Sequence, residues 1–141
     1  MEISVVRQRL RETIERAKRR AVERRGRNDE AARTYTSFLD HIAIPLMRQI
    51  ANALKADGYT FTVFTPTGSV KLMSDRHAED YIEIVLDTAG DTPAIVGHTS
   101  RRHGRMIDEA ERPVGSGMPG GVSEADLFDF LLKELEPFVE R

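Results

Sequence analysis

The chain has 141 residues, of which 40% are hydrophobic and 31% are charged, and its formal net charge is −2. This length is typical of one domain with one hydrophobic core. The absence of cysteine excludes disulfides, thiolate metal sites and cysteine nucleophiles. The charged N-terminus lacks the apolar stretch of a secretory signal, and no run reaches the roughly 18 apolar residues of a membrane span. The sequence therefore predicts a cytoplasmic protein without membrane attachment.

The charge is divided unevenly along the chain. Residues 1–27 carry ten Lys or Arg and four Glu, a net charge of +6, so the net charge of −2 leaves −8 for residues 28–141. We therefore interpret residues 1–27 as a basic arm and residues 28–141 as a single α+β domain. Such an arm is suited to an acidic partner: nucleic acid, a membrane surface or the acidic domain of a second copy.

The first 25 residues have the spacing of an amphipathic helix. Four apolar residues recur on one face, at Leu10, Ile14, Ala17 and Ala21. This stripe is too thin to hold a lone helix in water. It must pack on its own domain or on another chain, and we predict that it forms a homodimer interface.

A second helix is expected up to about residue 57. Gly26 and Asn28 predict a break between the two helices, with Asn28 as the N-cap of the second. Apolar residues then follow the spacing of a core helix, at Tyr35, Phe38, Leu39, Ile42, Leu46, Ile50 and Leu54. Pro45 lacks a backbone N–H and clashes with the preceding turn, which predicts a kink or a boundary there. Gly58 is placed to end the helix.

After Gly58 the apolar residues alternate, as they do in half-buried strands. We expect strands at residues 59–63, 70–73, 81–87 and 94–100, and a weaker fifth at 105–114, with a turn at 101–104. No helix separates them, so the sheet should be an antiparallel meander of four to five strands. The fold class is therefore α+β: two N-terminal helices, the meander and a C-terminal helix packed on the sheet.

The C-terminal helix should begin after the glycine-rich loop 115–121. Ser123 and Asp126 resemble a capping box. Six large apolar residues of this helix are expected to face the sheet, namely Leu127, Phe128, Leu131, Leu132, Leu135 and Phe138.

Two groups of arginines are candidate sites for anions or nucleic acid. Arg16 and Arg20 lie on the first helix, and Arg101, Arg102 and Arg105 surround a predicted turn. Guanidinium groups match phosphate oxygens. The simpler interpretation is a solvated charged surface, since aromatic residues for stacking are absent from the turn. Nucleic acid is therefore the less favoured partner.

Other motifs do not support a cofactor, a metal or a catalytic centre. The loop from Gly115 to Gly120 matches G-x-G-x-x-G, but the chain ends with the helix that follows, so no second strand completes a dinucleotide site. The four histidines show no metal-ligand spacing, and no nucleophile motif is present.

The sequence thus favours a non-catalytic interaction protein that self-associates through its N-terminal helix. The alternatives are a nucleic-acid-binding protein that uses the same helix, and a small-molecule binder or enzyme with a cleft between sheet and helices.

Overall fold

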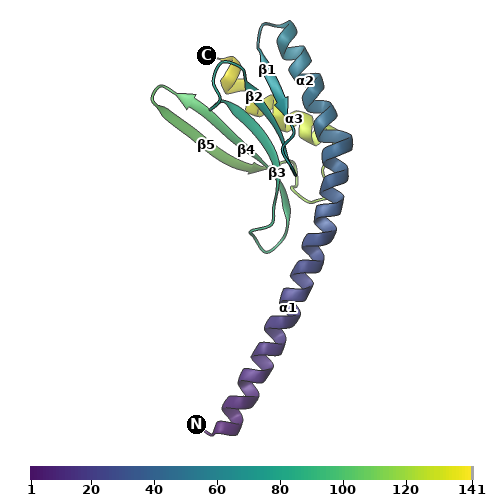
Figure 1. Cartoon of the computed structure of the whole chain (residues 1–141), viewed down its shortest axis with the longest axis vertical. Helices are drawn as coiled ribbons and strands as arrows, with labels where there is room; N and C mark the ends of the chain where they lie inside the picture. Colours follow the sequence, from purple (N-terminus) through teal and green to yellow (C-terminus); the bar gives the residue numbers. More distant parts are fainter. Residues whose placement is uncertain (141) are drawn as a thin grey trace.

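The computed structural model describes residues 1–140 and shows an α+β fold with a long helix projecting from it (Figure 1). The elements in chain order are α1 (Ile3–Phe38), the π-helical segment η1 (Leu39–Ala43), α2 (Ile44–Ala56), β1 (Phe61–Phe64), β2 (Val70–Ser74), β3 (Tyr81–Asp87), β4 (Ala94–His103), β5 (Met106–Pro113) and α3 (Glu124–Val139). The predicted fold class is confirmed. Among the described residues, no helix has the length and apolar character needed to cross a membrane.

The predicted break at Gly26 and Asn28 is wrong, because α1 runs through both residues as one helix of 36 residues. Gly26 does not adopt a positive φ. A glycine costs an exposed helix only about 1 kcal/mol, and the good helix formers on both sides outweigh that cost. The helix therefore continues unbroken from the basic arm into the acidic domain.

The hydrogen-bond pattern of the helix changes just before Pro45, where a boundary was predicted. The backbone N–H of Ile44 bonds to the carbonyl of Leu39, five residues back, so the turn before the proline is widened to a π-helix. Such one-turn widenings are a known way to relieve a helix that meets an obstacle. Pro45 then occupies the first turn of α2, where its missing N–H is tolerated. Gly58, with φ 90°, follows the end of α2, as expected.

The five strands form an antiparallel meander in the order β1-β2-β3-β4-β5. Val70, Leu72, Ile82, Ile84 and Ile95 are fully buried on one face. They form one core cluster with residues of α1, α2 and α3, among them Phe38, Met47, Ile50, Leu127 and Leu131. The helices therefore cover one face of the sheet, as expected.

The turn between β4 and β5 is shorter than predicted. β4 extends to His103, so Arg101 and Arg102 lie on a strand and not in the turn. Gly104, with φ 63°, supplies the left-handed residue of the tight turn that follows. The hairpin therefore projects as a ribbon beyond the sheet (Figure 1).

Only four of the six apolar residues expected to face the sheet from α3 do so. Leu127, Leu131, Leu135 and Phe138 are buried. Phe128 and Leu132 face solvent and are 41% and 49% exposed, which corrects the prediction. The predicted capping box is present, since the backbone N–H of Asp126 donates to Ser123 Oγ and that of Ser123 donates to Asp126 Oδ2.

The continuity of α1 can be tested by replacing its glycine. Gly26→Ala should slow amide hydrogen exchange at residues 22–30 about two- to fivefold, the equivalent of 0.5–1 kcal/mol of helix stability. A Cβ at this position meets no atom within 4 Å. Gly58→Ala is the control and should destabilise the protein, because Gly58 has a positive φ. A loss of exchange protection in Gly26→Ala would mean that the helix is broken there.

Candidate interaction surface

The N-terminal part of α1, residues 3–27, which we call the arm, projects away from the sheet (Figure 1). All of its residues except Val6 and Ala21 are exposed. The chain has an accessible surface of 9483 Å², about 2,100 Å² more than the roughly 7,400 Å² expected of a compact monomer of its mass. Much of this extra surface thus belongs to the apolar and charged side chains of the arm, which the rest of the chain leaves uncovered.

The predicted interface residues form an uncovered apolar line on the arm. We call Leu10, Ile14, Ala17 and Ala21 the arm seam. Leu10 is 57% exposed and Ile14 is 51% exposed. Leu10, Ile14 and Ala17 are therefore free of contacts that would bury them within their own chain, and Ala21 is half-buried.

The face of α1 that carries the arm seam leads into the core of the domain. After Ala21 the apolar line is interrupted at Arg24 and Arg25, and it continues through Asn28 to Ala31, Tyr35 and Phe38, of which the last three are buried. One face of one helix is therefore covered by its own domain in its second half and uncovered in its first. The uncovered half is an exposed continuation of a face that is buried further along the same helix.

The charges around the arm seam are almost all positive. At 100° per residue, six basic side chains lie within about 90° of the seam. They are Arg7, Arg11, Lys18, Arg20, Arg24 and Arg25. Glu12, Glu15 and Glu23 lie about 130° or more from the seam, on the opposite side of the helix. Arg16, a predicted anion-binding residue, also lies there, where its Nη2 donates to Thr13 Oγ1 at 3.3 Å.

A second uncovered apolar line lies on α3. We call Ala125, Phe128, Leu132 and Val139 the α3 seam; the first three are exposed and Val139 is half-buried. Four acidic side chains lie within about 90° of its centre, and Lys133 lies about 110° away. These acids are Glu124, Asp129, Glu136 and Glu140, all exposed.

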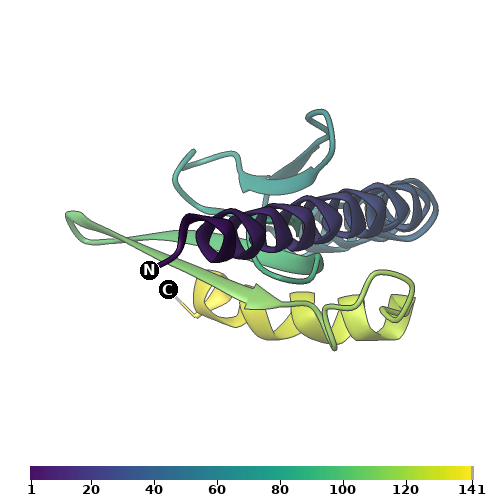
Figure 2. The ribbon, with the colours of Figure 1, turned by 90° about the horizontal axis from the view of Figure 1, so that it is seen from below.

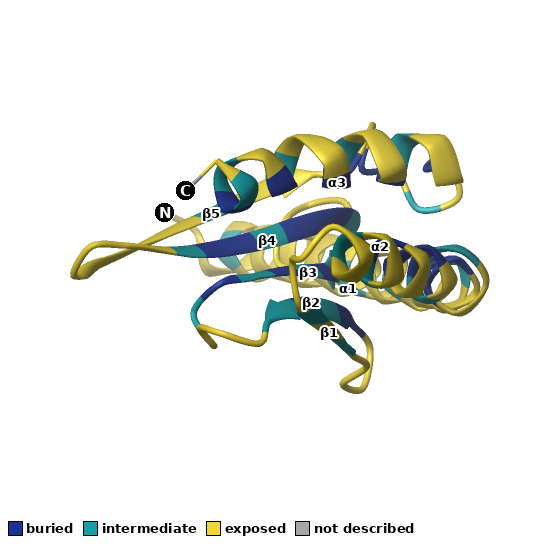
Figure 3. Ribbon diagram, turned by 90° about the horizontal axis from the view of Figure 1, so that it is seen from above, coloured by how far each residue is buried: buried dark blue, intermediate teal, exposed yellow. Residues whose placement is uncertain are grey.

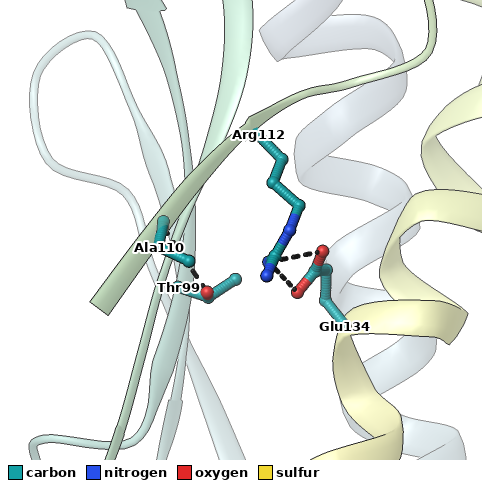
Figure 4. A network of polar contacts seen from close by, with 4 residues as sticks. All are labelled: Thr99, Ala110, Arg112 and Glu134. Atoms are coloured by element: carbon teal, nitrogen blue, oxygen red, sulfur yellow. Dashed lines mark hydrogen bonds and ion pairs between the residues drawn. The ribbon is translucent and has the colours of Figure 1, made fainter. Parts of the chain in front are cut away.

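The orientation of α3 is fixed from its inner side. Leu127 and Leu131 are fully buried against the core. Arg112 Nη1 of β5 donates to both carboxylate oxygens of Glu134, at 3.1 and 3.0 Å (Figure 4). In the same view, the hydroxyl of Thr99 on β4 points to the carbonyl of Ala110 on β5 at 3.5 Å. The α3 seam is consequently held facing away from the sheet.

The arginines of the β4–β5 ribbon are largely paired with acids. Arg101 lies 3.7 Å from Asp108, and Arg102 lies 3.7 Å from Glu79. Arg105 is exposed in the turn. Figure 1 places this ribbon and the arm at opposite ends of the molecule, so the two arginine groups are not brought together.

The sheet face opposite the helices carries a polar cluster that the sequence did not indicate. The ring of Tyr81 stacks on His98 with centroids 5.8 Å apart, and Lys71 Nζ lies 4.1 Å from the Tyr81 centroid. Burial, followed by the charges of Glu109 and Glu83, raises the pKa of the Tyr81 hydroxyl. Strand register brings these residues together, and His98 Nε2 lies 3.8 Å from Glu109 Oε1.

The grooves between the sheet and the helices differ in size. The one between the β4–β5 ribbon and α3 has a volume of 130 Å³, below the range of about 300–1,000 Å³ for ligand pockets. A larger one of 450 Å³, within that range, lies between α2 and β1 and is lined by polar residues such as Arg48 and Lys55 together with apolar ones such as Phe61 and Val63. Within the described residues, no group of three His, Asp or Glu side chains is placed to hold a metal ion.

No protein-family model, curated protein or solved structure matches this chain.

Proposed function

We propose that this chain is a non-catalytic cytoplasmic interaction protein that forms homodimers through the arm seam. The observation that carries the proposal is the exposed Leu10–Ile14 pair on a helix whose same face is buried further along the chain. Most of the stability of a helix in a protein comes from packing of its apolar face, and contact with a second chain would supply that packing for the arm.

The available surface is sufficient for such an interface. The excess surface of about 2,100 Å² is comparable with the 1,200–2,000 Å² that a standard interface buries in total. Exposed apolar residues arranged as one line mark interaction sites more strongly than scattered ones. Self-association would cover this line without any rearrangement of the domain.

The test is the solution mass of the full chain. Wild type at tens of micromolar should sediment as a dimer, and Leu10→Gln/Ile14→Gln should sediment as a monomer, because both substitutions place polar groups where the partner would bury them. The dissociation constant should rise at least about a hundredfold, since two buried apolar side chains contribute about 1.5–3 kcal/mol each.

Val5→Gln/Val22→Gln provides a matched control on the same helix. Val5 and Val22 are 41% and 59% exposed, but they lie about 150° and 110° from the arm seam. This variant should remain dimeric. A wild-type chain that is monomeric at 100 µM would overturn the proposal. An equal weakening of dimerisation in the seam variant and in the control variant would also overturn it.

The six basic residues beside the arm seam also favour a second function, nucleic-acid binding. The glutamates on the far side of the arm and the ion pairs of Arg101 and Arg102 reduce the free positive charge for this role. With no Trp and three Tyr, the protein absorbs weakly at 280 nm, so copurifying nucleic acid would dominate its ultraviolet spectrum. A protein-like spectrum together with no binding to duplex DNA or RNA at low salt would exclude this function.

A further inference from the structure

We propose that the surface receiving the arm is the outer face of α3 in a second copy of this chain. The inference rests on the proposed self-association and specifies its geometry. The arm seam of one copy would lie along the α3 seam of the other.

The apolar residues of the two seams are complementary in size. The arm seam, and the α3 seam from Ala125 to Leu132, follow the spacing of three and four residues that lets two helices pack along their length. The arm offers two large residues and then two small ones, Ala17 and Ala21. These alanines leave room for the side chains of Phe128 and Leu132, which protrude from α3.

The charges that border the two seams are opposite. Six Lys or Arg residues border the arm seam, and four Asp or Glu residues border the α3 seam. Pairing one arm with another would instead place basic borders against each other, since the glutamates of the arm lie on its far side. Like charges that face each other across an interface cost several kcal/mol, so the acidic seam of α3 is the favoured partner.

The contact must come from a second chain. Seen from below, α1 runs toward the viewer and α3 forms a separate layer beneath it (Figure 2). Figure 3, coloured by burial, shows that the exposed side of α3 points away from both the sheet and α1. Because α1 is one unbroken helix, its arm has no loop through which to fold back onto its own α3.

A charge exchange between two variants tests this arrangement. The first variant, Asp129→Lys/Glu136→Lys, makes the α3 border basic, and the second, Arg11→Glu/Lys18→Glu, makes the arm border acidic. Each alone should associate at least about tenfold more weakly than wild type. Their equimolar mixture should form a heterodimer with two contacts between an arm and an α3 helix. In one contact both borders are wild type, and in the other the acidic arm of the second variant meets the basic α3 border of the first.

Asp40→Lys/Asp57→Lys is the control for net charge. Both carboxylates are exposed and lie on neither seam, and the change in net charge equals that of the α3 variant. Its dissociation constant should match that of wild type within about twofold, since charges outside an interface act weakly. Circular dichroism and thermal unfolding of every variant verify that the fold is intact.

The outcomes separate this inference from the proposed function. If wild type dimerises and the α3 variant dimerises equally well, the inference is wrong and the proposed function stands, with arm-to-arm pairing as the explanation. If wild type is monomeric, both fail. The absence of native cysteine allows a direct check: Ala17→Cys or Ala21→Cys mixed with Leu132→Cys should give a disulfide-linked heterodimer, whereas pairing between arms would not.

Discussion

Gly97→Ala should destabilise the protein by about 1–3 kcal/mol, the usual cost of adding a methyl group to a filled site. Gly97 lies on β4, on the face covered by the helices, and a Cβ built there would overlap the ring of Phe130 from α3. The ring would have to leave its place over the sheet. Urea denaturation monitored by circular dichroism measures the change in the free energy of unfolding.

The clash with Phe130 gives this prediction a distinctive control. In a Phe130→Ala background, Gly97→Ala should become neutral or stabilising by up to about 1 kcal/mol, because alanine loses less backbone entropy than glycine on folding. Gly90→Ala, in an exposed loop where the nearest atom is 3.9 Å from the new Cβ, should have little effect. If Gly97→Ala lowered the free energy of unfolding equally with and without Phe130, the assigned packing of α3 would be contradicted.

Tyr35→Phe should cost about 1–3 kcal/mol, because it removes a buried donor from two carbonyl groups. The Tyr35 hydroxyl lies 2.8 Å from the carbonyl oxygen of Gly68 and 3.1 Å from that of Ile84, and the residue is 4% exposed. This contact joins α1 to the β1–β2 turn and to β3. Tyr59→Phe, on an exposed tyrosine, should change stability by less than about 0.5 kcal/mol.

The hydroxyl of Tyr35 also predicts a dependence on alkaline pH. Burial, and then the charge of Glu83, raises the pKa of Tyr35 above its ordinary value of 10.0. The folded state therefore retains a proton that the unfolded state loses. Below pH 10 the stability difference between wild type and Tyr35→Phe should be constant, and above pH 10 it should shrink by up to about 1.4 kcal/mol per pH unit. A constant difference up to pH 11.5 would show that the hydroxyl is not buried.

The sequence predicted the sheet well because its signal is local. Alternation of apolar residues from Tyr59 onward determines the strands, and the absence of crossover helices determines the meander. The proline at position 45 likewise marks a change in the helix from its chemistry alone. Predictions of this kind depend on neighbours within a few residues.

The errors arose where local patterns in the sequence did not determine the structure. On α3, the spacing of Leu127, Leu131 and Leu135 and the spacing of Ala125, Phe128 and Leu132 each describe an apolar face, and only packing on the sheet selects the first. At Gly26, the weak preference of glycine against helix was outweighed by its neighbours. Arg101 and Arg102 were assigned to a turn because the length of β4 depends on its pairing with β5.

The candidate interface was predictable in part. The arm seam follows from the spacing of Leu10, Ile14, Ala17 and Ala21, and the structure leaves it exposed. Placing each charge around the helix axis would have shown that the borders of the seam are basic, since this needs only the helical repeat. The α3 seam and the stack of Tyr81 on His98 could not be predicted, because they depend on burial and on strand register.

Because α1 is unbroken, it fixes the direction in which the arm seam faces relative to the sheet. About 30 Å of helix separates the middle of the arm seam from Tyr35, at 1.5 Å per residue. Adding or removing one residue in this stretch would rotate the seam by about 100° relative to the domain, whereas a change of seven residues would alter its reach by about 10 Å and nearly preserve its direction. The direction of the arm seam is therefore preserved only by changes close to a whole number of helical turns, such as seven or eleven residues.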